Sequence, residues 1–115
     1  MRMLNLTIYD TTPEQYDLGV VSLGEEEQKD LIQLLTFDDL TTNKEIKDRA
    51  ARVASFADNH GCESALISGP PYLIKALRKR LKKLGITPFY AFATRVLDKD
   101  GVWTGEWRHK GFIEA

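Results

Sequence analysis

The stretch of sequence that decides the fold is residues 63–93, ESALISGPPYLIKALRKRLKKLGITPFYAFA. A short apolar run at residues 65–67 precedes a tight turn, and a basic amphipathic helix then runs to Leu84, where Gly85 ends it. A second apolar run begins at Phe89. This order predicts a βαβ unit with two parallel strands, because the connection is too long for a hairpin.

Short elements are predicted before this unit. Residues 4–8 alternate apolar and polar side chains, which predicts a first strand. Thr12 and Gln15 have the spacing of a capping box and predict a short helix that Gly19 ends. A small extended piece is predicted at residues 20–23.

Two longer helices are predicted between these short elements and the βαβ unit. Three acidic residues at 25–27 suit the positive end of a helix that is predicted to run to Leu35. Thr42 and Glu45 have the spacing of a second capping box, and the helix after them is predicted to end near Gly61.

The C-terminal part predicts an antiparallel hairpin. Residues 89–93 are apolar throughout, which is typical of a strand buried on both faces, and this strand is predicted to continue to Leu97. Residues 98–101, DKDG, predict a hairpin turn, so residues 102–113 return at the sheet edge. We expect the first strand in the middle of the sheet, flanked by the strand at Ala65 and, as one option, by the strand at Phe89.

These elements together predict an α/β fold with a small Rossmann-like open sheet. The sheet is mostly parallel, ends in an antiparallel hairpin, and has helices packed on it. A chain of 115 residues has the size of one domain, so residues 1–115 are predicted to form a single α/β domain. No apolar run approaches the roughly 18 residues of a membrane span and no signal peptide is recognised, so we expect a cytoplasmic protein without a membrane partner.

Charge is distributed unevenly along the chain. Residues 1–60 hold 12 acidic and 6 basic residues, whereas residues 61–115 hold 5 acidic and 10 basic residues. Most of this positive excess lies on the helix before Leu84, which is either a solvated outer face or a surface that attracts anionic partners. Aromatic residues are not interleaved with these cations, so direct nucleic-acid binding is not expected.

Two turns of the predicted sheet offer a ligand site. In open α/β sheets ligands bind at the carboxyl ends of the strands, where helices begin. Thr11 and Thr12 follow the first strand, and Ser68 and Gly69 follow the second, so these four residues are the predicted ligand-binding residues for an anion. Alternatively, Gly69 serves only the bend of the backbone, and the prolines after it remove N–H donors.

The sequence contains few other residues in patterns typical of metal, cofactor or catalytic sites. Two histidines and one cysteine lack the spacing of metal ligands, so no metal site and no cofactor is predicted, and whether the protein is an enzyme is left open. Three aromatic residues of the last hairpin, Trp103, Trp107 and Phe112, are predicted either to cover the sheet or to form a subunit contact.

The patterns NLT…TPEQ at residues 5–15, SGPPYL at residues 68–73 and FYAF at residues 89–92 resemble a family of small uncharacterised bacterial and prophage proteins. More remotely, the strand followed by TPEQ is similar to CRISPR-associated Rossmann-like (CARF-like) sensors and ring nucleases. That resemblance implies a homodimer that holds a cyclic oligonucleotide across the strand ends. It also implies a pocket lined by Thr11, Thr12, Ser68 and Gly69.

Three classes of function remain open on this basis. The first is a small binding module for an anionic, nucleotide-like ligand at the carboxyl ends of the strands. The second is a phosphodiesterase of the ring-nuclease type, although neither strand-end loop carries a Lys or His. The third is a phage or bacterial protein-interaction module that uses the aromatic hairpin or the basic helix. The first two classes need a pocket at the strand ends, and the third needs an exposed apolar patch.

Overall fold

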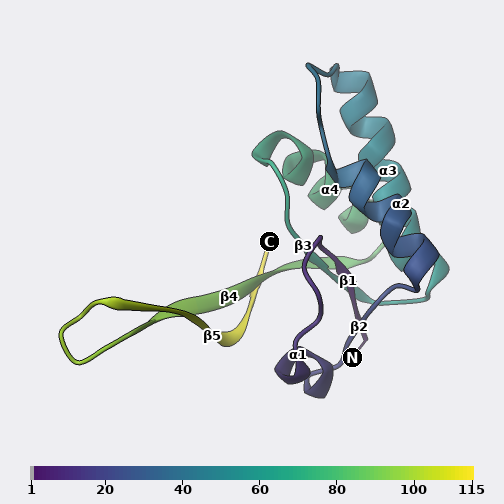
Figure 1. The fold of residues 1–115 in the computed structure, drawn as a ribbon. Coiled ribbons are helices and arrows are strands. Elements are labelled where there is room, and N and C mark those ends of the chain that lie inside the picture. Colours follow the sequence, from purple (N-terminus) through teal and green to yellow (C-terminus); the bar gives the residue numbers. More distant parts are fainter. Residues whose placement is uncertain (1) are drawn as a thin grey trace.

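A computed structural model describes residues 2–115 and contains a five-stranded sheet in the order β2-β1-β3-β4-β5 (Figure 1). The elements are β1 (Met3–Leu6), α1 (Pro13–Asp17), β2 (Val20–Val21), α2 (Glu25–Leu35), α3 (Asn43–Asn59), β3 (Ser64–Ile67), α4 (Pro71–Lys83), β4 (Thr87–Leu97) and β5 (Trp103–Glu114). The pairings among β2, β1, β3 and β4 are parallel, and β4 pairs with β5 antiparallel. The predicted α/β class, the βαβ unit and the C-terminal antiparallel pair are therefore confirmed.

Capping residues explain where the helices begin. The Thr12 side chain accepts a hydrogen bond from the Gln15 N–H at 3.2 Å, and the Gln15 side chain accepts one from the Thr12 N–H at 3.0 Å. This is the capping box predicted for α1. At α3 the Thr42 side chain caps the Glu45 N–H as predicted, but the Glu45 carboxylate pairs with Arg49 instead of completing the box.

The predicted strand order is right on one side of β1 and wrong on the other. β1 adjoins β3 as expected, but its second neighbour is β2, and β4 pairs with β3. The reason lies in the length of α1, which has only five residues and returns the chain to the free edge of β1. Met3 pairs there with Val20, so β2 occupies this edge and β4 pairs with β3 on the other side.

Three helices cover one face of the sheet. In Figure 1, α2, α3 and α4 lie together on one side, and α1 lies on the other. The core between the sheet and the three helices is built from buried residues of both layers, among them Leu4, Leu6, Ala65, Ile67, Leu31, Val53, Leu73 and Leu77. A smaller cluster lies elsewhere in the molecule and contains Met3, Val20 and Leu66. Within residues 2–115, none of the helices combines the length and the apolar character needed to cross a bilayer.

β4 is not buried on both faces, which corrects the prediction for residues 89–93. Ala91 and Phe92 are exposed. β4 has 11 residues and β3 only four, so the pairing with β3 ends at Phe89. Beyond that point β4 has β5 as its one neighbouring strand, and the pair projects away from the helices (Figure 1). We call this projecting pair, residues 91–112, the arm.

The arm makes the molecule elongated. Its principal extents are 49 × 34 × 26 Å and its radius of gyration is 15.1 Å. A compact chain of this length would have a radius of gyration of about 13 Å. A large part of the β4–β5 pair therefore lies outside the two-layer body.

Candidate functional site

A hollow of about 280 Å³ lies at the carboxyl ends of β1 and β2, whereas the predicted site was expected at the carboxyl ends of β1 and β3. β1, the loop after it, α1, the segment after β2 and the start of α2 supply the residues that line it. These are Asn5, Tyr9, Asp10, Thr11, Tyr16, Ser22, Leu23, Glu25 and Gln28.

A chain of hydrogen bonds organises this hollow. The buried Asn5 amide donates to the Thr11 hydroxyl at 2.9 Å and accepts from the Thr7 hydroxyl at 2.6 Å. The Thr11 hydroxyl lies 2.7 Å from that of Ser22, which in turn lies 2.8 Å from the hydroxyl of Tyr16. These hydroxyls bond to one another, so their main effect is to hold the loop after β1 against α1 and β2.

The charges in the hollow do not favour an anion. Asp10 and Glu25 are among the lining residues, and the lining contains no Lys or Arg. The positive end of the α2 dipole is nearby, but Glu25, Glu26 and Glu27 already occupy the first turn of that helix. A nucleotide-like ligand would therefore meet carboxylates instead of compensating cations.

The structure brings only one of the four predicted ligand residues into this hollow, namely Thr11. The side chain and N–H of Thr12 are both engaged in the capping box of α1. Gly69 has a φ of +145°, a conformation that L side chains rarely adopt, so the backbone itself requires glycine there. Anion binding at Thr11, Thr12, Ser68 and Gly69 stays a prediction, and the geometry of Gly69 supports the alternative that it serves the bend.

The turn after β3 is also poor in donors. Pro70 and Pro71 have no N–H groups, and the N–H groups of Leu73 and Ile74 both donate to the Pro70 carbonyl at 3.0 Å. Few of the free N–H groups that normally make a helix start attractive to anions therefore remain.

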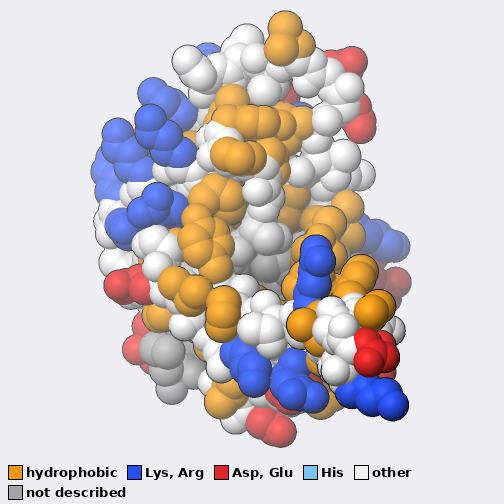
Figure 2. Space-filling model, turned by 90° about the vertical axis from the view of Figure 1, so that its left-hand side faces the viewer, with side chains coloured by type: hydrophobic (Ala, Val, Ile, Leu, Met, Phe, Trp, Pro, Cys, Tyr) orange, Lys and Arg blue, Asp and Glu red, His pale blue; other side chains and the backbone are white. Residues whose placement is uncertain are grey.

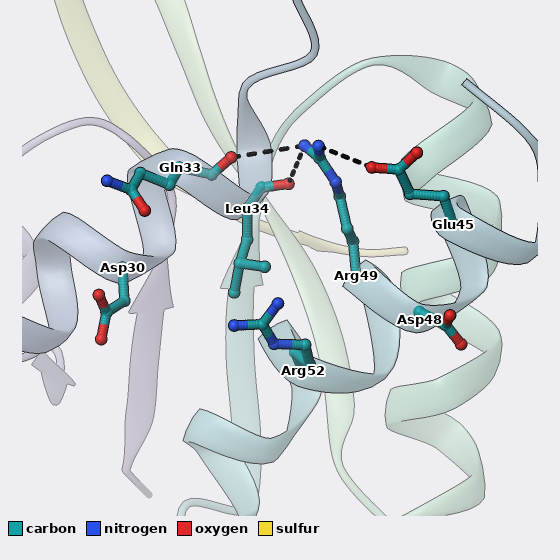
Figure 3. A pocket seen from close by; sticks show the side chains of 7 residues that line it. All are labelled: Asp30, Gln33, Leu34, Glu45, Asp48, Arg49 and Arg52. Carbon is teal, nitrogen blue, oxygen red and sulfur yellow. Dashed lines mark hydrogen bonds and ion pairs between the residues drawn. The ribbon is translucent and has the colours of Figure 1, made fainter.

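A larger hollow of about 400 Å³ lies between α2 and α3, but its central cation has a structural role (Figure 3). Arg49 donates to the carbonyl oxygens of Gln33 and Leu34 at 3.4 Å and of Thr36 at 2.7 Å. Its other terminal nitrogen pairs with the Glu45 carboxylate at 3.0 Å. Arg49 thus caps the last carbonyls of α2 from the neighbouring helix.

Trp103, Trp107 and Phe112 of the arm differ in how they pack against the sheet. Phe112 packs against the cluster of Met3, Val20 and Leu66, so it helps to cover the sheet. Trp103 and Trp107 do not, because they remain 44% and 58% exposed.

One face of the arm carries these aromatic residues together. The two indole rings meet edge to face with centroids 5.7 Å apart, and the Arg95 guanidinium lies 5.0 and 5.6 Å from them. The register pairs Arg95 with Trp107 and Ala91 with Phe112, so these side chains share one face of the ribbon.

The two histidines lie in separate parts of the described chain and contact different groups. His60 caps α3, and its Nε2 lies 3.0 Å from the Glu27 carboxylate. The His109 ring packs against the Phe112 ring at an angle of 59°, with centroids 5.1 Å apart. Over residues 2–115, no three His, Cys, Asp or Glu side chains converge in a way that could hold a metal ion.

Comparisons of the chain with protein-family models, with curated proteins and with solved structures gave no match. The assignment of a function therefore rests on the geometry of the molecule itself.

Proposed function

We propose that this protein is a protein-interaction module that forms a homodimer through the aromatic face of its arm. The observation that carries the proposal is the pair Trp103 and Trp107, half-exposed on a two-stranded ribbon that extends past the helices. An isolated two-stranded ribbon is only marginally stable in water. Tryptophan and arginine are also the residues most enriched at the centres of protein interfaces, and Arg95 lies over both rings.

The charge of the arm favours a second copy as the partner. Residues 91–112 hold three acidic and four basic residues, so two arms can face each other with little net repulsion. In a twofold dimer each patch meets its own copy, which requires a surface that is complementary to itself. The basic helix α4 and the acidic N-terminal half would both repel their own copies.

The size of an ordinary interface sets the extent of the contact. Such an interface buries roughly 800 Å² on each partner, which requires the length of the arm and not its tip alone. We therefore place the contact along the face that runs from Phe112 past Trp107 to Trp103.

This proposal fits the structure better than a small-ligand function does. The hollow at the strand ends is lined by Asp10 and Glu25 without a cation, so neither a nucleotide site nor a phosphodiesterase gains support from it. The arm, in contrast, leaves large apolar side chains in water, and contiguous exposed apolar surface marks sites of association.

Sedimentation velocity over a range of protein concentrations tests the proposal. The wild type should sediment as a dimer at high concentration, and Trp107→Ser should raise the dissociation constant roughly 30-fold or more, as expected for an aromatic anchor. Ile32→Ser is the matched control, because Ile32 is an exposed apolar residue on the outer face of α2.

Two results would overturn the proposal. One is a wild-type protein that stays monomeric at every concentration. The other is a dimer that Trp107→Ser and Ile32→Ser weaken equally, because the contact would then lie away from the arm.

A further inference from the structure

A groove runs along the outer seam between α3 and α4. It consists of two adjoining hollows of about 250 and 410 Å³, which share Lys47, Ala76 and Lys79 in their linings. Its apolar lining residues are Ile46, Ala51, Tyr72 and Ala76. Its cations are Lys47, Lys75, Lys79, Arg80 and Lys83, and no acidic residue lines either hollow.

The cations of this groove have no partners in the described chain. Other cations do form ion pairs, such as Lys44 with Asp48 and Arg49 with Glu45. None of the five groove cations forms an ion pair with any residue between 2 and 115. Figure 2 shows a group of Lys and Arg side chains at its upper left, beside a band of hydrophobic side chains, and further Lys and Arg side chains along the bottom.

The spacing of the lysines on α4 adds a cost that a partner would remove. Lys75, Lys79 and Lys83 follow one another at intervals of four residues, so each stands next to a like charge on the same helix face. Like charges at this interval destabilise a helix. Carboxylates from outside the chain would offset that repulsion.

We propose that the groove binds an acidic amphipathic helix of a partner protein. The cations would pair with its carboxylates, and Ile46, Tyr72 and the two alanines would contact its apolar face. The groove extends along α3 from Asn43 to Ala51, which corresponds to roughly 12 Å or two helical turns. The phosphate backbone of a nucleic acid would pair with the cations, but it has no apolar surface to contact the apolar lining residues. The lining therefore favours a peptide.

A synthetic peptide tests this inference. The probe is a helix of about 14 residues with leucines on one face and glutamates beside them, and its control is a scrambled peptide of the same composition. In isothermal titration the amphipathic peptide should bind with one peptide per chain and more tightly than the scrambled one. Lys79→Glu should weaken it about five- to tenfold, because an attraction in the middle of the groove becomes a repulsion.

Lys82→Glu is the matched control. It makes the same change of charge on the same helix, but Lys82 lines neither hollow, so binding should weaken by no more than about twofold. Ala76→Leu should fill the floor and weaken the peptide without changing the charge. The Trp107→Ser variant should bind the peptide as the wild type does, so the proposal for the groove is tested independently of the proposal for the arm.

Three outcomes would overturn the inference. The first is that the amphipathic peptide does not bind or binds no better than its scrambled control. The second is that Lys79→Glu and Lys82→Glu weaken binding equally, which would indicate attraction by the general field of α4. The third is that a duplex DNA probe binds more tightly than the peptide and is unaffected by Ala76→Leu, which would identify a surface for phosphate backbones.

Discussion

At the scale of single residues, Arg49 shows how a helix end is completed by a neighbouring helix. α2 ends at Leu35, and its last carbonyl groups have no partners within the helix. The guanidinium of Arg49 donates to the carbonyls of Gln33 and Leu34 in α2 and to that of Thr36 directly after it, and its Cζ lies 4.3 Å from the centre of the Phe37 ring. Only arginine offers this fork of donors together with a flat face.

Replacing Arg49 should therefore cost more than replacing its neighbour Arg52. We expect Arg49→Ala to lower the free energy of unfolding by about 2–3 kcal/mol, from lost charged hydrogen bonds and the ring contact, and Arg49→Lys to recover only part of it. Arg52→Ala, at an exposed position of the same hollow, should change it by less than about 0.5 kcal/mol. Urea denaturation measures all three variants, and equal effects of the two alanine substitutions would show that Arg49 does not cap α2.

Leu77 provides the corresponding prediction for the core. It is fully buried between α4 and the sheet, as the apolar stripe of the basic helix predicts. Leu77→Ala should destabilise the protein by about 2–5 kcal/mol, because it removes apolar contacts and leaves a cavity. Lys79→Ala, on the exposed face, should change the stability by less than about 0.5 kcal/mol. Thermal or urea unfolding that showed similar losses for both would mean that the two faces of α4 are assigned wrongly.

At the scale of elements, the sequence predicts well what depends on neighbouring residues. The capping box at Thr12, the stop of α4 near Gly85 and the DKDG turn all arise from contacts within a few residues, and all are present. The strand order depended instead on which element reaches the open edge of β1. β2 has only two residues, which is too short for an alternation of apolar and polar side chains to predict that it pairs with β1.

The exposure of β4 and the groove beside α4 both depend on which elements lie next to each other in the fold. An apolar run indicates burial only if neighbours exist on both sides, and β3 is too short to accompany β4 past Phe89. The sequence shows the lysines of α4 as a basic run without acidic residues. The other wall of the groove is α3, and that α3 lies beside α4 is seen only in the fold. Of the strand-end site, sequence reasoning found Thr11 but missed Asn5 and Ser22, whose roles come from hydrogen bonds across the loop.

Hydrogen exchange should separate the arm from the body. β1 and β3 are buried throughout, whereas the arm is a ribbon without a third strand or a helix layer. At dilutions where the protein is monomeric, we expect the amides of residues 93–97 and 103–109 to exchange much faster than those of β1 and β3. Equal protection in the monomer would show that the arm is stable alone and does not need a partner.

At the scale of the whole molecule, the charges are separated into three regions. The hollow at the strand ends is acidic, the groove between α3 and α4 is basic, and the arm is close to neutral. Each region therefore suits a different kind of partner. Salt can distinguish them, because screening acts on net charge and leaves apolar contacts in place.

Dimerisation through the arm should accordingly depend little on ionic strength. Between about 0.05 and 0.5 M sodium chloride, we expect its dissociation constant to change by less than about threefold, since a balanced apolar interface has little net electrostatic energy to lose. Binding of the acidic peptide to the groove should weaken markedly over the same range. Sedimentation at several salt concentrations measures the first effect, and a dimer that dissociates strongly with salt would point to a contact between the acidic and basic regions instead.

The tryptophan fluorescence of the wild-type protein, measured on dilution, tests the dimer contact through the arm without any substitution. Trp103 and Trp107 are the two tryptophans of the chain, and both lie on the face that we assign to the dimer contact. We predict that their emission shifts to longer wavelength on dilution, as the rings pass from the interface into water, with a midpoint at the dissociation constant from sedimentation. Emission that stays constant while sedimentation shows the dimer dissociating would contradict a contact through the arm.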